Sequence, residues 1–177
     1  MPEVNLLVIT GQEGAGKTTT VRAIGTATPS SARIDAEDVG ETNPWDMNDD
    51  FMQLLWKNVA DLTRNFWDAG YRTVVAGSFV NTIEEYRRFR AILNRDASVY
   101  VVQLCAGKSV RDVRRIERGK PTTEEWRDMV DQADPEDTSL ASSADGYRFL
   151  RIDNDGFDVG QTVQRIQAWA PELYAPA

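Results

Sequence analysis

The chain has 177 residues, of which 41% are hydrophobic and 27% charged, and its net charge is −8. The acidic total argues against a nucleic-acid partner, because a phosphate backbone attracts basic surfaces. The sequence has no apolar run long enough to cross a membrane and only one cysteine, Cys105, so we expect a cytoplasmic protein without internal disulfides. It also contains no histidine, so a general base would have to be a carboxylate.

The first predicted element is a strand at residues 4–9, which leads into a phosphate-binding loop. Residues 11–18 read GQEGAGKT and match the P-loop pattern G-x-x-x-x-G-K-T, and residues 19–24 can continue as a helix. Such a loop directs backbone N–H groups at phosphate oxygens, with Lys17 reaching the β- and γ-phosphates and the Thr18 hydroxyl holding Mg²⁺. The missing guanine motif N-K-x-D favours ATP over GTP without deciding between them. The expected nucleotide contacts are Gly11, Gln12, Glu13, Gly14, Ala15, Gly16, Lys17, Thr18 and Thr19.

Carboxylates follow the second predicted strand, residues 32–35. Asp35 ends this strand, and Glu37 and Asp38 come directly after it. Ligands bind beyond the carboxyl ends of parallel strands, so Asp35 should face the same crevice as the P-loop. We predict that Asp35 is the general base for an attacking hydroxyl, that Asp35 and Asp38 join Thr18 at Mg²⁺, and that all three carboxylates border the acceptor. Which of them is the base and which serves the metal stays open.

A long helix is predicted from about residue 48 to residue 69. Its apolar residues recur with a period near 3.6, and Trp56 and Trp67, on the flanks of the apolar face, are interpreted as packing residues. Trp45, just before this helix, could either stack on the acceptor or cover the core. The predicted apolar face consists of Phe51, Leu54, Leu55, Val59, Leu62 and Phe66.

The third predicted strand, residues 72–77, is informative because no acid follows it. Residues 74–79 read VVAGSF, whereas a switch GTPase, or an ATPase with a catalytic glutamate, needs a carboxylate at this point. Asp35 and its neighbours therefore become the expected source of carboxylates for the metal.

The remaining elements complete the predicted fold. Further strands are expected at residues 98–105 and 147–152, and capping boxes predict helix starts at Thr82, Ser109 and Thr122. Strands that alternate with helices predict an α/β protein, a three-layer P-loop NTPase fold with a five-stranded parallel sheet and helices on both faces. We expect a single domain over residues 1–177.

Four arginines share one face of the predicted helix after residue 107. Arg111, Arg114, Arg115 and Arg118 repel one another there, and the acids of the same helix offset only part of that repulsion. One interpretation is a solvated, salt-bridged helix. The other, which we favour, is a lid over about residues 107–121 that closes on the triphosphate, with Arg114 and Arg118 stabilising charge on the migrating phosphoryl group.

Together these motifs resemble the small P-loop kinases, the group of gluconate kinase, shikimate kinase and chloramphenicol phosphotransferase. Asp35-Ala36-Glu37 with Glu41 is similar to the shikimate kinase pattern, in which the acids serve magnesium and the acceptor hydroxyls. Chloramphenicol phosphotransferase has an aspartate base at the position that Asp35 matches. The resemblance implies that a lid arginine, here Arg114, and the loop with Asn154 hold the adenine.

The segment 77–90 resembles gluconate kinase, in which a small-residue turn precedes a helix that lines the acceptor pocket. This likeness implies that Arg87 or Arg90 contacts the acceptor. The glycine-rich shikimate-binding turn is absent, and so is the histidine that commonly follows the gluconate kinase lid arginine. The resemblance therefore indicates a reaction type and leaves the acceptor open.

The sequence thus predicts an ATP- and Mg²⁺-dependent phosphotransferase acting on a hydroxyl of a small molecule, such as a metabolite, sugar acid or drug. One alternative is a nucleoside or nucleoside monophosphate kinase, with Arg72, Arg87 and Arg88 at an acceptor phosphate. Another is a non-catalytic ATP-binding regulatory module. The oligomeric state is not predicted.

Overall fold

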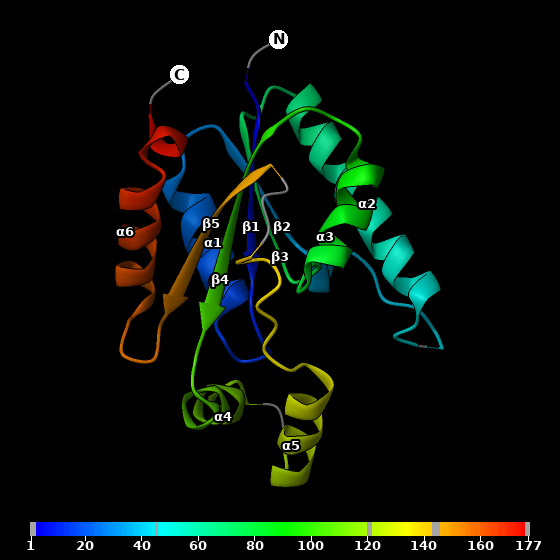
Figure 1. Cartoon of the computed structure of the whole chain (residues 1–177), viewed down its shortest axis with the longest axis vertical. Coiled ribbons are helices and arrows are strands. Elements are labelled where there is room, and N and C mark those ends of the chain that lie inside the picture. Colours follow the sequence, from blue (N-terminus) through cyan, green and yellow to red (C-terminus); the bar gives the residue numbers. More distant parts are fainter. Residues whose placement is uncertain (1–2, 45, 120–121, 143–145, 176–177) are drawn as a thin grey trace.

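The centre of the molecule is a five-stranded parallel sheet with the strand order β2-β3-β1-β4-β5 (Figure 1). It is seen in a computed structural model that describes residues 3–44, 46–119, 122–142 and 146–175. All five strands lie within one residue of their predicted bounds. They are β1 (Asn5–Thr10), β2 (Ser31–Asp35), β3 (Thr73–Gly77), β4 (Ser98–Cys105) and β5 (Tyr147–Asp153).

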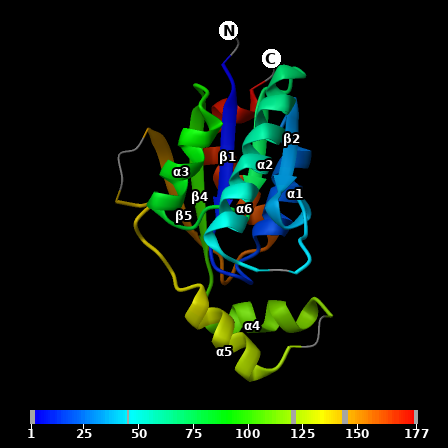
Figure 2. The same ribbon diagram turned by 90° about the vertical axis from the view of Figure 1, so that its right-hand side faces the viewer.

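Helices cover both faces of this sheet, which confirms the predicted three-layer α/β fold. On one side are α1 (Lys17–Ala27) and α6 (Val159–Trp169), and on the other are α2 (Asp49–Asp68) and α3 (Ile83–Leu93) (Figure 1). Two more helices, α4 (Lys108–Glu117) and α5 (Glu124–Ala133), lie beyond the carboxyl ends of the strands (Figure 2). Short 3-10 helices follow β2 (Ala36–Asp38) and α6 (Pro171–Tyr174). No helix within the described ranges is long and apolar enough to cross a membrane.

The alternation of side chains along β1 divides the core into two layers. Leu6 and Val8 pack with α2 and α3, whereas Leu7 and Ile9 pack with α1 and α6, and all four side chains are fully buried. Successive residues of a strand point to opposite faces, so a continuous apolar run is what a strand covered on both sides requires. The core fixes the positions of the strands, and the P-loop and Asp35 lie at the carboxyl ends of β1 and β2.

Helix α2 is rotated from the orientation that its apolar pattern predicts. Leu54 and Leu62 are exposed, so their placement on the buried face is wrong, while Trp56 and Trp67 are buried. The Trp56 Nε1–H donates to the carbonyl of Phe79 at 2.7 Å, and the Trp67 Nε1–H donates to a β1 carbonyl at 3.2 Å. Burying two indoles with satisfied N–H groups outweighs burying two leucines. The interpretation of both tryptophans as packing residues is confirmed.

The predicted helix starts are right in one case and displaced in two. Thr82 caps α3 in a full capping box with Glu85. Helix α4 begins after Gly107 rather than Ser109, because the Gly107 N–H donates to Asp155 at 2.7 Å and anchors the turn there. Helix α5 is capped by Thr123, one residue later than predicted.

Candidate active site

The P-loop requires glycine at two of its positions. Gly11 has φ +137°, and a Cβ atom there would lie 2.3 Å from the carbonyl oxygen of Leu104. Gly16 caps the amino end of α1 with a left-handed φ of 99°. Side chains rarely tolerate either conformation, so the two glycines allow the tight turn that brings the loop onto the amino end of α1. This is the geometry that binds phosphate.

Lys17 lies across its own loop. Its Nζ donates to the carbonyl oxygens of Gly11 at 2.6 Å and Gln12 at 3.1 Å. Burial lowers the pKa of Lys17, and the nearby carboxylates of Asp134 and Glu37 partly offset this effect. The ammonium group is thus held at the loop among acids, where an anionic phosphate group would be a stronger partner.

A small cleft of about 430 Å³ opens beside the P-loop. Its lining includes Gly16, Thr19, Arg114, Arg118, Asn154 and Phe157. Arg114 and Asn154 are 40 residues apart in the sequence, yet Arg114 Nη1 donates to Asn154 Oδ1 at 3.2 Å. Both side chains also donate to the carbonyl oxygen of Ala15, from Arg114 Nη1 at 3.2 Å and from Asn154 Nδ2 at 2.9 Å. The two residues predicted to hold the adenine therefore lie together against the P-loop.

Replacing Arg114 by alanine is expected to weaken ATP binding by about tenfold, because one charge-assisted contact is lost from the small cleft. Isothermal titration with a non-hydrolysable ATP analogue measures this change. Arg88→Ala is a matched control, since the Arg88 side chain is exposed on α3 and pairs with Glu84 at 2.6 Å. Equal affinities for the two variants would remove Arg114 from the nucleotide site.

Two of the four arginines on the predicted arginine face are buried and paired with acids. Arg111 and Arg115 are the two buried residues of α4, with side chains 7% and 2% exposed. Both pair with Asp131 of α5, at 3.0 Å and 2.7 Å, and Arg115 also pairs with Glu13 of the P-loop. Both guanidinium groups are therefore already paired with acids, and of the two only Arg115 also lines the large cleft described below. Their repulsion is relieved by acids from other segments, a partnership that the helix sequence cannot reveal.

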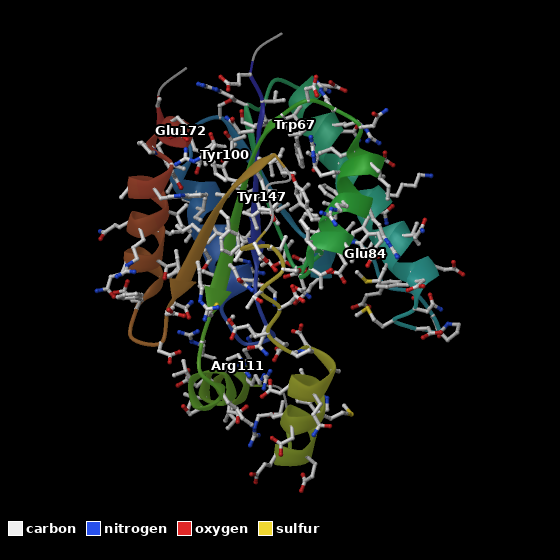
Figure 3. All side chains as sticks on the ribbon, viewed as in Figure 1. Trp67, Glu84, Tyr100, Arg111, Tyr147 and Glu172 are labelled. Carbon is white, nitrogen blue, oxygen red and sulfur yellow. The ribbon has the colours of Figure 1, made fainter. Side chains whose placement is uncertain are left out.

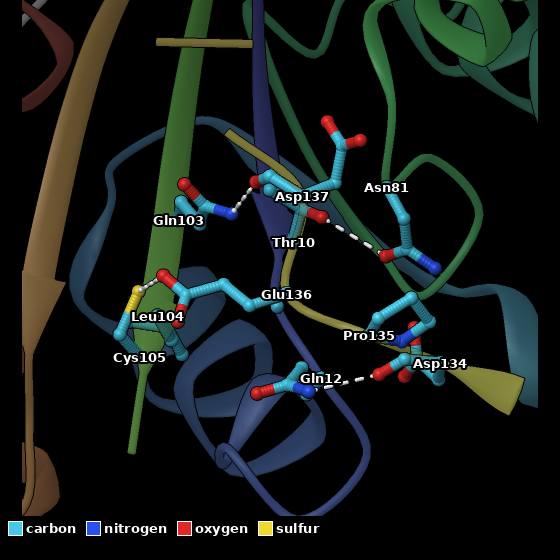
Figure 4. Close-up of a pocket in the computed structure, with 11 residues that line it drawn as sticks. Thr10, Gln12, Asn81, Gln103, Leu104, Cys105, Asp134, Pro135, Glu136 and Asp137 are labelled. Atoms are coloured by element: carbon cyan, nitrogen blue, oxygen red, sulfur yellow. Dashed lines mark hydrogen bonds between the residues drawn. The ribbon is translucent and has the colours of Figure 1, made fainter. Parts of the chain in front are cut away.

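The strap at residues 134–137, which follows α5, runs back over the ends of β1 and β4 (Figure 4). The Glu13 N–H donates to Asp134 Oδ2 at 3.0 Å, and Gln12 Nε2 donates to the Asp134 carbonyl at 2.8 Å. Gln103 Nε2 donates to the carbonyl of Asp137 at 2.7 Å. These bonds tie the strap that leaves α5 to both the P-loop and the sheet.

Asp35 lies at the carboxyl end of β2, next to β3, and is buried. Its Oδ1 accepts the Glu37 N–H at 3.3 Å and so caps the short helix that follows. Among the described residues no group donates to its other oxygen, the buried Oδ2. Glu37 and Asp38 are exposed. A buried carboxylate oxygen without a donor is a site for a proton donor or a cation.

A large cleft of about 950 Å³ separates the segment after Asp35 from helices α4 and α5, which are together called the lid below. Its lining includes Glu13, Glu37, Asp38, Ser78, Arg118 and Trp126. Arg118 lines the small cleft as well, and its Nη1 donates to Glu13 Oε1 at 2.9 Å. The two clefts therefore meet at the P-loop and Arg118.

Comparison with known proteins identifies solved structures that share this fold. No protein-family model matches the sequence, and no curated protein does. The structure is similar to that of a sugar kinase from Janibacter sp. HTCC2649, at TM-score 0.69 and 17% identity over 99% of this chain and 100% of that one. A gluconokinase from Sinorhizobium meliloti 1021 gives 0.67 and 14%, over 98% and 95% of the two chains. The tunicamycin resistance protein of Deinococcus radiodurans gives 0.64 and 17%, over 99% and 100%.

The chain shares its fold with this sugar kinase, this gluconokinase and this tunicamycin resistance protein. Identities this low do not transfer a substrate, so residue roles have to come from the chain's own geometry. In this kinase fold the predicted nucleotide residues, the carboxylates after β2 and the lid all gather at one edge of the sheet.

Two predicted acceptor contacts do not reach the clefts of this kinase fold. Arg90 Nη1 donates to the carbonyl of Arg95 at 3.2 Å, near the amino ends of the strands, and Arg87 is exposed on α3. Neither lines the large cleft as the described residues define it. The reason is that α3 runs back antiparallel to β3, so residues beyond its first turn move away from the active edge. Trp45, and residues 120–121 of the predicted lid, lie outside the described residues.

Among the cleft residues that sequence reasoning missed are Phe157 and Ser78. Phe157 lines the small cleft, and no motif in the loop after β5 indicates this role. Ser78 lines the large cleft, with a left-handed φ of 68° that is unusual for a residue other than glycine. Within the described part of the chain, its buried Oγ has no hydrogen-bond partner. The turn sequence Gly77-Ser78 was the one available signal.

The described residues could hold a magnesium ion at the carboxyl ends of the strands only together with phosphate oxygens. No group of three carboxylate, cysteine or histidine side chains could hold a metal within the described ranges. Magnesium in phosphoryl-transfer sites typically takes one or two protein ligands and completes its shell with phosphate oxygens and water. Thr18 and the Asp35 Oδ2 without a donor are consistent with such a shell.

Proposed function

We propose that the chain transfers the γ-phosphoryl group of ATP to a hydroxyl group of a small molecule. The observation that carries the proposal is the position of Arg118, which lines both clefts. A guanidinium group at the boundary between nucleotide and acceptor stabilises charge on a phosphoryl group in transit. The P-loop kinase fold supports the same assignment.

Each proposed role follows from the chemistry of one side chain. The P-loop amides and Lys17 bind the phosphates, and Arg114 and Asn154 hold the nucleoside. The acceptor oxygen attacks the γ-phosphorus, the bond from that phosphorus to the bridging oxygen breaks, and the hydroxyl proton passes to Asp35. ADP is then the leaving group. Mg²⁺ is assigned to Thr18 with Asp38 or Asp35, and when bound it neutralises charge on the phosphate oxygens.

A nucleotide acceptor is less well supported than a hydroxyl compound without phosphate. Arg72, Arg87 and Arg88 are the cations that such an acceptor would need, and none of them lines the large cleft of the described chain. Arg72 lies at the opposite edge of the sheet, where its N–H donates to the carbonyl of Ser30 at 2.8 Å.

Coupled measurement of ADP production tests the proposal. A phosphotransferase should release ADP in proportion to a hydroxyl acceptor from a panel of sugars, sugar acids, amino sugars and nucleosides, and mass spectrometry should find that acceptor heavier by one phosphoryl group. Lys17→Met should abolish both signals. ATP binding without acceptor-dependent ADP release across the panel would favour a regulatory module instead.

A further inference from the structure

The large cleft carries an excess of negative charge. Its lining contains four carboxylates and two guanidinium groups. Glu13 pairs with both guanidinium groups, and Arg115 pairs with Asp131 as well. Within the described ranges the three remaining carboxylates form no ion pair. These carboxylates, called the acidic rim below, are Glu37, Asp38 and Glu41.

Apolar side chains form the facing walls of the same cleft. Phe51 and Leu55 of α2 contribute to the lining, and so does Met47, which is 59% exposed. Trp126 of α5, 40% exposed, also lines it from the lid. An aromatic face attracts a cation, and an apolar wall binds the carbon skeleton that carries it. The volume of about 950 Å³ leaves room for more than one sugar ring.

Two buried polar atoms next to the acidic rim point independently to a ligand. Asp35, 6% exposed, directly precedes the cleft-lining residue Ala36, and its Oδ2 has no donor among the described residues. Ser78 Oγ, in the cleft lining, likewise lacks a partner there. A hydroxyl group satisfies both kinds of atom, because it donates to a carboxylate and exchanges hydrogen bonds with a serine.

We propose that the acceptor is an alcohol that carries a protonated amine, with its ammonium group at the acidic rim and its carbon skeleton between Phe51 and Trp126. This inference rests on the proposed phosphotransferase function and names the substrate class of the same site. A sugar acid or a nucleotide would bring negative charge against three carboxylates that form no ion pair within the described ranges, of which Glu37 alone is near enough to Lys17 to affect its pKa. A neutral alcohol would leave this negative charge uncompensated.

Probes of similar size and different charge test the inference. The two-ring aminoglycoside neamine, its fully N-acetylated derivative and the disaccharide-derived acid lactobionate are titrated into the protein with Mg²⁺ and a non-hydrolysable ATP analogue. Neamine is expected to bind at least about tenfold more tightly than either of the others. That preference should shrink by about threefold in Glu41→Gln and weaken as salt is raised. Glu84→Gln, on the exposed face of α3 (Figure 3), is the matched control and should change nothing.

The outcomes separate this inference from the proposed function. If neamine fails to bind, or binds no better than the acetylated or anionic probe, the inference is overturned. If the protein transfers the phosphoryl group of ATP only to neutral or anionic alcohols, the inference is overturned while the phosphotransferase function stands. If neamine binds selectively at the acidic rim but no probe receives a phosphoryl group, the charge preference stands and the phosphotransferase proposal fails.

Discussion

Asp35→Asn is expected to lower acceptor-dependent ADP formation by about 10³-fold, because the amide cannot accept the proton of the attacking hydroxyl. Asparagine keeps the side-chain oxygen that accepts the Glu37 N–H, so the cap of the 3-10 helix after β2 is preserved. The loss should therefore appear in kcat, with little change in thermal stability or in affinity for an ATP analogue. Steady-state kinetics and titration calorimetry measure the two quantities separately.

Asp38→Asn is the comparison variant for this experiment. Asp38 lies three residues further along, is exposed in the large cleft and is a candidate Mg²⁺ ligand rather than the proposed base, so its loss should cost less in kcat than the loss of Asp35. The pH profile adds a second readout, since loss of a base removes the acidic limb of the kcat profile. A normal rate in Asp35→Asn together with a severe loss in Asp38→Asn would transfer the role of base to Asp38.

The parts of the molecule that sequence predicts well are those specified by neighbouring residues. The strands follow from apolar runs, and the turn of the P-loop follows from glycines at fixed spacing. The placement of Asp35 at the active edge follows from topology, because parallel strands end together. Each of these rules acts within about ten residues or within one sheet.

The parts that sequence misjudges depend on partners far along the chain. Arg115 is separated from Glu13 by 102 residues, so a helical wheel cannot show that its charge is already paired. Leu54 and Leu62 match the apolar period as well as their neighbours do. In the folded chain, however, α2 buries the indole rings of Trp56 and Trp67 instead. For α3, the capping box at Thr82 predicts the start of the helix correctly without showing that Arg90 lies away from the clefts.

The lid is held by ion pairs rather than by an apolar core. In α4 the only buried residues are Arg111 and Arg115, and no residue of α5 is buried. Lys108 adds a pair with Asp128 of α5 at 2.9 Å. The lid should therefore open more readily than the sheet, and more readily still at high salt, because ion pairs are screened while buried apolar contacts are not.

Arg115→Met is accordingly expected to lower the hydrogen-exchange protection of α4 and α5 by about 10²-fold, which corresponds to about 3 kcal/mol for breaking a buried ion pair. Methionine retains much of the arginine's apolar volume, so the change isolates the charge. It leaves Asp131 and Glu13 without their best donor, whereas β1 and β4 should keep their protection because the apolar core is untouched. Hydrogen exchange read by mass spectrometry resolves these segments.

Arg118→Met provides the comparison within the same lid. Its side chain is 44% exposed and, within the described ranges, pairs with Glu13 alone, so protection of α4 and α5 should fall by about threefold or less. The kinetic pattern should be reversed, because Arg118 lines both clefts and its loss should reduce kcat even where the lid stays closed. Equal loss of protection in the two variants would contradict an ionic interior at Arg115, and uniform loss across the sheet would show that the lid does not open by itself.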